Sequence, residues 1–133
     1  MMIERLVAEL DAAGAVPVAW RAAFLAVPRH RFLPSQVWVD DDQGKPRPLS
    51  RDDDAGRWLE WAYRNVPILT QFDDGQTAWP ATHGELCTSS ASKPDLVLSM
   101  LASLDVHDDH TVLEIGTGTG YNAALLAARL GAP

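Results

Sequence analysis

"VLEIGTGTGYNAALLA" (residues 112–127) decides the predicted fold, because it joins an apolar run, a glycine turn and an alanine-rich segment. Residues 111–116, TVLEIG, show little alternation between apolar and polar side chains, which is typical of a strand covered on both faces. YNAALLAARLG favours a helix that ends at Gly131. The stretch therefore predicts a buried strand, a tight turn and a helix, which together open a nucleotide-type binding site.

The spacing of the glycines indicates which cofactor the turn suits. Gly116, Gly118 and Gly120 give G-x-G-x-G, whereas the dinucleotide fingerprint is G-x-G-x-x-G. Glu114 is a poor neighbour for a diphosphate and a good one for a cation, and no lysine follows the turn as a P-loop requires. S-adenosylmethionine carries an ammonium and a sulfonium, and backbone N–H groups at the helix start can bind its carboxylate. The residues favour this cofactor, with a turn that binds nothing as the alternative.

A mixed, mainly helical region precedes this unit. Apolar residues at helical spacing predict helices over residues 3–10 and 17–27, and a shorter one over 58–63. VPILTQF, residues 66–72, predicts a strand. DDDQGKPRPLSRDDD, residues 40–54, contains two Asp triplets, two prolines and a glycine, which predicts a loop.

The composition of the chain changes near Leu86. Ser92 is predicted as the N-cap of a helix with Pro94 in its first turn, and an apolar stripe follows. We therefore expect an α/β protein with two regions. Residues 1–85 would form a cap and substrate region. Residues 86–133 would hold the helix, first strand and first helix of a Rossmann-like domain that is incomplete in this chain.

Charge and composition exclude several classes of partner. The 133 residues carry 11 basic and 18 acidic side chains, a net charge of −7, which argues against a nucleic acid. Cys87 is the only cysteine, so no intramolecular disulfide forms. The N-terminal MMIERLVAEL is charged where a signal peptide needs an apolar core, and no apolar stretch is long enough to span a membrane. A cytoplasmic protein without membrane partners is expected.

Three blocks of the sequence together resemble the protein-L-isoaspartate O-methyltransferase family. Residues 112–127 resemble its motif I, VPRHRFLP (27–34) resembles the segment after its first helices, and SASKPDLVLSML (90–101) resembles its Thr-Ile-Ser-x-Pro segment. Ser90-Ala91-Ser92 and Lys93 depart from the family pattern. The acidic loop at 40–54 and YRNVPILTQFDDG resemble the branch that methylates ribosomally made peptides. The acceptor, an isoaspartate in a damaged protein or a carboxylate in a dedicated peptide, stays open.

The resemblance implies transfer of the methyl group of S-adenosylmethionine to a protein or peptide carboxylate. A carboxyl group has a reference pKa of about 4 and is already ionised at neutral pH, so no general base is needed. Ser92 would hold the acceptor carboxylate, in competition with its role as a helix N-cap. The residues expected to lie against the cofactor are Glu114, Gly116, Thr117, Gly118, Thr119, Gly120 and Tyr121. No metal site is expected, and Cys87 is expected to be a small, buried or half-buried side chain.

A methyltransferase sheet has about seven strands, and this sequence reaches only the first, which leaves three hypotheses. In the first, which we favour, the chain is the N-terminal part of a carboxyl methyltransferase and needs the missing C-terminal half. In the second, a second chain completes the sheet, and the protein is a non-catalytic half-domain that serves as a binding or regulatory subunit. In the third, the glycine turn is coincidental and the chain is an interaction domain.

Overall fold

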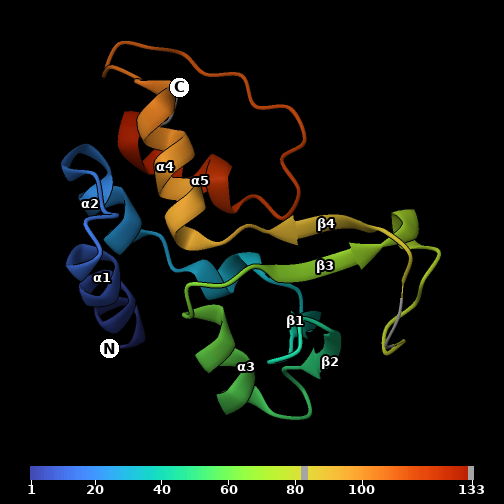
Figure 1. The fold of residues 1–133 in the computed structure, drawn as a ribbon. Coiled ribbons are helices and arrows are strands. Elements are labelled where there is room, and N and C mark those ends of the chain that lie inside the picture. The colour runs from blue at the N-terminus through green and yellow to red at the C-terminus, as the bar shows by residue number, and fades with distance from the viewer. Residues whose placement is uncertain (82–83, 132–133) are drawn as a thin grey trace.

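Two helices open the chain, and the computed structural model describes residues 1–81 and 84–131. The first helix, α1 (Met2–Ala12), buries Leu6, Val7 and Leu10, which share one face at helical spacing. The second, α2 (Val18–Ala26), begins after Pro17 and buries Trp20 and Phe24. Both predicted helices are confirmed within a few residues of their expected ends (Figure 1).

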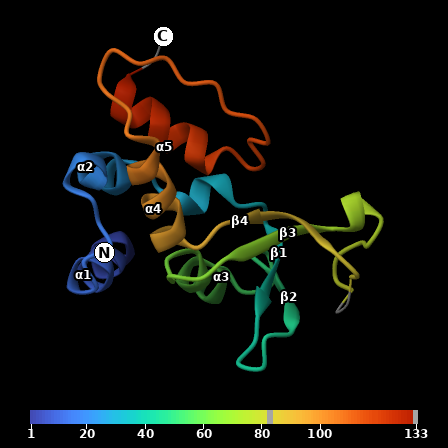
Figure 2. The ribbon, with the colours of Figure 1, turned by 45° about the horizontal axis from the view of Figure 1, so that its top comes forward.

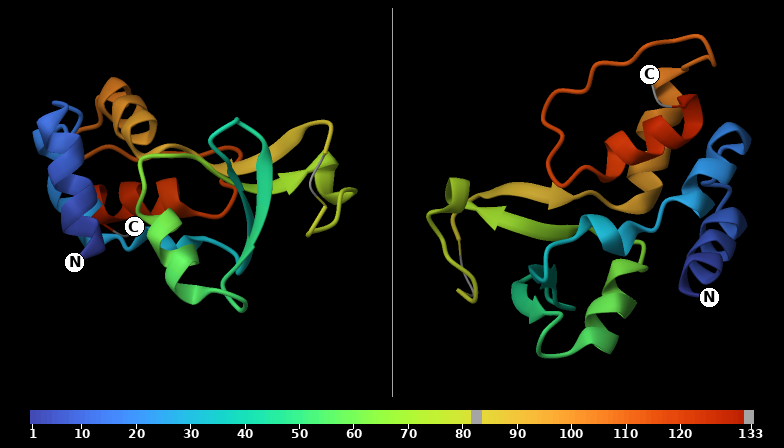
Figure 3. Two further views of the ribbon diagram at one scale, coloured as in Figure 1. Left: turned by 60° about the horizontal axis from the view of Figure 1, so that its bottom comes forward. Right: turned by 180° about the vertical axis from the view of Figure 1, so that it is seen from behind.

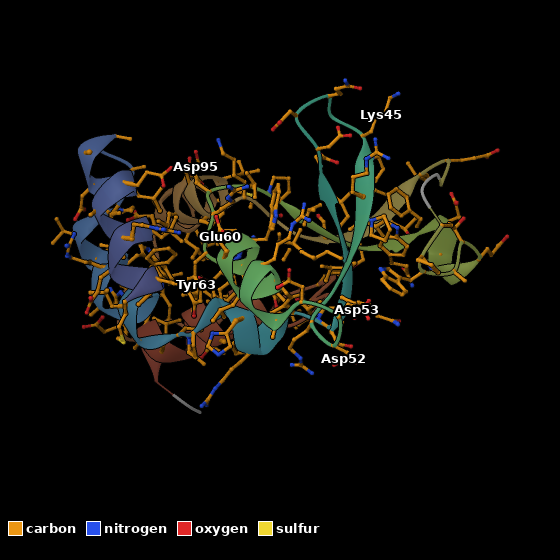
Figure 4. All side chains as sticks on the ribbon, turned by 90° about the horizontal axis from the view of Figure 1, so that it is seen from below. Lys45, Asp52, Asp53, Glu60, Tyr63 and Asp95 are labelled. Atoms are coloured by element: carbon orange, nitrogen blue, oxygen red, sulfur yellow. The ribbon has the colours of Figure 1, made fainter. Side chains whose placement is uncertain are left out.

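A β-hairpin replaces most of the predicted loop at 40–54, and that prediction was wrong. After a short 3₁₀ turn, η1 (Arg29–Phe32), strand β1 (Gln36–Asp40) pairs antiparallel with β2 (Pro46–Ser50). The Asp41 carboxylate closes the turn by accepting the backbone N–H groups of Gln43 and Lys45. Figure 4 shows Lys45 at the tip of this hairpin, with Asp52 and Asp53 at its other end. The prolines of β2 are tolerated because it is an edge strand.

The sheet continues through residues that are far apart in the sequence. Helix α3 (Ala55–Ala62) and strand β3 (Ile68–Phe72) confirm two predicted elements, and a short turn, η2 (Asp73–Gly75), follows. Strand β4 (Cys87–Ala91) was not predicted, and Cys87 is exposed on it rather than buried. All pairs are antiparallel and the strand order is β2-β1-β3-β4, so β4 is an edge strand.

Helix α4 (Pro94–Leu104) begins one residue later than a Ser92 cap would require. Its N-cap is Lys93, whose side chain makes no capping hydrogen bond, and Pro94 is its first residue. The free N–H of Asp95 in the first turn is instead accepted by Asn65 Oδ1 at 3.1 Å. Ser92 therefore lies between β4 and α4, and the prediction that it caps the helix was wrong. Pro94, which has no N–H to satisfy, takes the first helical position instead.

Residues 111–116, the predicted first strand, form no strand in the described part of the chain. They belong to a long connection from α4 to α5 (Tyr121–Leu130) that arches away from the helices (Figure 3). Leu113 is 86% exposed and Ile115 is 90% exposed, whereas Val112 and Glu114 between them are half-buried, so only one face of the segment is covered. A strand forms only beside a partner, and no described strand lies next to this segment. Helix α5 itself and its end before Gly131 are confirmed.

One hydrophobic core joins the helices to the sheet, and the predicted α/β class is confirmed. Helix α5 contacts α2, which also contacts α1 and α4 (Figure 2). Core residues come from both sides of the expected division at 85/86, among them Phe24, Ile68 and Leu125. That division stays a prediction, and residues 132–133, the last of the second expected region, lie outside the described residues.

Candidate cofactor and acceptor site

A cleft of about 550 Å³ lies between β4, the start of α4 and the glycine turn before α5. Its volume is within the range of small-molecule sites. Figure 1 shows the connection from α4 descending onto the end of β4, where the cleft lies. Seven of the eight predicted site residues line it, and only Gly120 does not: the lining includes Ser92, Glu114, Gly116, Thr117, Gly118, Thr119 and Tyr121. Residues 22 or more positions apart in sequence are thus brought together, while their roles stay predictions.

Only one oxygen of the Glu114 carboxylate has a hydrogen-bond partner among the described residues. Its Oε1 accepts a hydrogen bond of 2.7 Å from the side-chain amide of Asn122. Its Oε2 is buried and has no hydrogen-bond partner among the described residues. A buried acceptor left without a partner costs about 1–3 kcal/mol, and more if it is charged. The orphaned oxygen on a cleft-lining residue therefore marks a position where a ligand donor, above all a cationic one, would be stabilised.

The glycine turn has a backbone conformation that other residues rarely adopt. Gly116, Gly118 and Gly120 have φ of 74°, 59° and 94°. A Cβ at Gly118 would lie 3.8 Å from the Ser89 Oγ on β4, so the turn runs close along that strand. Glycine here combines a positive φ with a bare backbone that a ligand can approach.

Helix α5 presents its N-terminus to the cleft. Gly120 is its N-cap, and in the described chain no side chain bonds to the first N–H groups. Tyr121, the first helical residue, is buried, and its hydroxyl has no partner among the described residues. Burial raises the pKa of this phenol, against the opposing charge of Arg29, so it stays protonated and can donate a hydrogen bond.

The backbone at Ser92 is fixed by a buried arginine. Arg29, in η1, is fully buried, and its Nη2 donates to the carbonyl oxygens of Ala91 at 3.3 Å and Ser92 at 3.1 Å. The same guanidinium donates to the carbonyl of Ala62, the last residue of α3, and to those of Arg64 and Val66 just after it. The residue thereby joins the strand that carries the cleft to the end of α3.

No carboxylate among the described residues pairs with Arg29, although it carries a charge. Burial lowers its pKa to about 10, with Tyr121 and Tyr63 acting in the opposite direction. The group therefore remains protonated at neutral pH, and five carbonyl dipoles replace a counter-ion. Its Nε has no described partner.

Sequence reasoning did not identify Arg29 or Asn122. Arg29 lies in VPRHRFLP, which was noted only for its family resemblance, and nothing local in that segment reveals that its acceptors lie between residues 62 and 92. Asn122 follows the glycine turn directly. A carboxylate before a glycine turn and an amide donor just after it could have predicted a hydrogen bond across the turn.

A second hollow, of about 640 Å³, lies between α1, the end of α3, the residues that connect α3 to β3, and the end of β1 with the turn that follows it. Glu60 and Tyr63, labelled in Figure 4, belong to its lining, and Glu60 pairs with Arg64 at 3.4 Å. No predicted site residue lines this hollow. Among the described residues, no group of three or more metal-ligating side chains is gathered, and no helix is long and apolar enough to cross a membrane.

The chain belongs to the protein-L-isoaspartate(D-aspartate) O-methyltransferase family, whose model matches residues 2–132. It is 35% identical over 107 residues to protein-L-isoaspartate O-methyltransferase 1 of Nitrosospira multiformis, an alignment that covers 80% of this chain and 30% of the relative. The enzyme of Methanosarcina mazei is 31% identical over 109 residues, 82% of this chain and 30% of the relative. The enzyme of Xanthobacter autotrophicus is 49% identical over 41 residues, an alignment that covers 31% of this chain and 19% of the relative. The matched part spans less than a third of these relatives.

Proposed function

We propose that this chain supplies the motif I cofactor contacts and the acceptor-binding segment of an S-adenosylmethionine-dependent O-methyltransferase that methylates a protein or peptide carboxylate. The observation that carries the proposal is the orphaned Glu114 Oε2, on a residue that lines the same cleft as the glycine turn and Ser92. Membership of the family supports the reaction class. The relatives bear the name protein-L-isoaspartate O-methyltransferase, which makes an isoaspartyl carboxylate the first acceptor to test.

The residues of the cleft fit the amino-acid end of the cofactor. Glu114 offers a negative charge to the ammonium, and the uncapped N-terminus of α5 offers N–H groups to the carboxylate. Gly116 and Gly118 leave the backbone bare for close approach. When bound, S-adenosylmethionine supplies a methyl group on a sulfonium, which a carboxylate oxygen can accept.

Ser92 would bind the acceptor carboxylate beside this position. The Arg29 hydrogen bond to the Ser92 carbonyl restrains this segment. The N-cap residue of α4 is Lys93 rather than Ser92, so the Ser92 hydroxyl is not needed to cap the helix. Orientation of the two reactants alone can contribute about 7–11 kcal/mol to lowering a barrier. An acceptor ionised at neutral pH needs no proton removed, so binding and orientation are what these residues have to provide.

Residues 111–116 would pair with a strand from outside the described residues. Their exposed Leu113 and Ile115 and their unpaired backbone support this. Further polypeptide of the same protein is the source that the longer relatives favour. A second chain is the alternative, and in that case the protein would be a binding or regulatory subunit.

The test is calorimetric titration of the chain with S-adenosylhomocysteine, with two matched glycine variants alongside. Gly118→Val places a side chain at a positive φ inside the cleft, and Gly44→Val does so at φ 71° in the β1–β2 turn. Micromolar binding by the wild type and Gly44→Val, lost in Gly118→Val, would support the proposal, and methyl transfer to isoaspartyl peptides would then be assayed. A folded wild-type chain that binds no ligand would contradict a working cofactor site in this chain.

Size measurements test the two-chain alternative. Analytical ultracentrifugation of the chain over a range of concentrations would detect self-association. A dimer that binds S-adenosylhomocysteine when the monomer does not would favour completion of the site by a second chain.

A further inference from the structure

Asn122 and Glu114 are joined across the glycine turn. Asn122 is the second residue of α5, and its Nδ2 reaches back to Glu114 Oε1, eight residues earlier, at 2.7 Å. The seven residues between them include all three turn glycines, each at a positive φ. Glycines leave the backbone of a turn flexible. The hydrogen bond links the residue before the turn to a residue after it, and it therefore restrains the turn.

The bond also fixes which carboxylate oxygen remains available. Glu114 Oε1 is occupied, and Oε2 is buried without a partner among the described residues. Because an amide is neutral, it satisfies one oxygen without cancelling the carboxylate charge, as a lysine or arginine at 122 would. Both residues line the cleft, so the oriented charge belongs to the same space as the glycine turn.

We infer that Asn122 is a positioning residue, which holds the Glu114 carboxylate so that its second oxygen accepts the ammonium group of the cofactor. The inference rests on the proposed function, because it assumes a ligand with a cationic amine in this cleft. It adds a specific requirement: Asn122 acts through Glu114 and contributes only to ligands that carry the amine.

The test compares two ligands on the full chain by calorimetry. One is S-adenosylhomocysteine, and the other is its analogue in which hydrogen replaces the α-amino group. Asn122→Ala is expected to weaken binding of the first by about tenfold and to leave binding of the second unchanged. In a Glu114→Gln background the same substitution should have no further effect, as a double-mutant cycle requires.

Asn65→Ala is the matched control. Asn65 Nδ2 donates to Asp95 Oδ2 at 3.1 Å near the start of α4, and Asn65 does not line the cleft. Asn65 Oδ1 also accepts the backbone N–H of Asp95 at 3.1 Å. Loss of the side chain removes both bonds and should leave both affinities unchanged. Alanine is a better helix former than asparagine, so weaker binding by Asn122→Ala would not arise from a weakened α5.

The outcomes separate the two levels of the argument. Equal weakening for both ligands, or none for S-adenosylhomocysteine, would overturn the role of Asn122 and leave the proposed function standing. A wild-type chain that binds neither ligand would overturn the proposed function, and this inference with it. In the free chain, Glu114→Gln should shift the NMR resonances of the Asn122 side-chain amide protons, and resonances that do not respond would also overturn the bond between the two side chains.

Discussion

Arg29 Nη2 donates a hydrogen bond of 3.1 Å to the carbonyl oxygen of Ser92, 63 residues further along the chain. Four other carbonyls share this guanidinium, three of them at the end of α3 or just after it. A fully buried arginine without a described carboxylate partner is held by peptide dipoles alone. The placement of the segment at Ser92, which we propose binds the acceptor, thus depends on a side chain in a different part of the sequence.

Replacing Arg29 should therefore destabilise the whole chain. Arg29→Met would leave five buried or half-buried carbonyls without their donor, and each orphaned acceptor costs about 1–3 kcal/mol. We expect a loss of at least about 3 kcal/mol in the free energy of unfolding. Urea unfolding followed by tryptophan fluorescence measures it. Arg31→Met, at an exposed neighbour, should change stability by less than about 0.5 kcal/mol, and equal effects of both substitutions would refute the role of Arg29.

Two leucines that precede the glycine turn, one exposed and one buried, should respond very differently to truncation. Leu113 is 86% exposed, so Leu113→Ala is expected to change the free energy of unfolding by less than about 0.5 kcal/mol. Leu98 is fully buried in α4, so Leu98→Ala should lower the free energy of unfolding by about 2–5 kcal/mol. Urea unfolding at low protein concentration compares them. A large loss for Leu113→Ala would mean that the side chain is covered in solution, as it would be in a self-associated chain.

Acid should weaken the contact between His30 and Tyr63, whose ring nitrogen Nδ1 and hydroxyl lie 2.7 Å apart. Burial first, and then the charge of Arg31, lower the pKa of His30 below its usual 6.5. As the pH falls, the unfolded chain takes up this proton before the folded one does. The stability that His30 contributes is therefore complete above about pH 6.5 and is lost as the pH falls toward the folded pKa.

Unfolding measured between about pH 7.5 and 5.5 should show this loss in the wild type and a smaller one in His30→Gln. The carboxyl groups with shifted pKa values do not interfere, because those of Asp41, Asp73, Asp95 and Asp108 are lowered from 3.8. Identical pH profiles for the two proteins would refute this assignment.

Substitution of the α5 N-cap tests the turn geometry without any ligand. Gly120 has φ of 94°, so Gly120→Ala is expected to destabilise the chain by about 1–2 kcal/mol. Gly56 lies inside α3 at an ordinary φ with room for a Cβ, and Gly56→Ala should stabilise it by about 0.5–1 kcal/mol. Thermal unfolding of both variants gives the sign. A stabilising Gly120→Ala would show that the turn has a different conformation in solution.

Local sequence patterns predicted those elements that are fixed by local contacts. The apolar spacing in α1, α2 and α5 is carried by residues three and four positions apart, such as Leu6 and Leu10, and these helices formed as expected. Strand β4 was missed because CTSSA has no apolar alternation and is ordered by pairing with β3. The strand predicted at 111–116 failed for the converse reason, since its pattern is apolar but no described strand lies beside it.

The candidate site divides in the same way. The glycine turn and Glu114 were found from their spacing in a single motif, and they line one cleft. Arg29 could not be found, because its five acceptors become neighbours only when α3, β4 and η1 pack together. Asn122 was overlooked because asparagine at the start of a helix is ordinary, and only the distance to Glu114 distinguishes it.

The carbonyl cluster around Arg29 has a consequence for how the chain opens. One guanidinium closes contacts from η1, the end of α3 and the end of β4 at once, so releasing Ser92 means breaking bonds that also hold the other two segments. Amide hydrogen exchange near Ser92 should then proceed through cooperative opening of all three, at a rate close to that of global unfolding. The proposed acceptor-binding segment at Ser92 would then be rigid. The connection between α4 and α5 would be the part that moves to admit a large substrate.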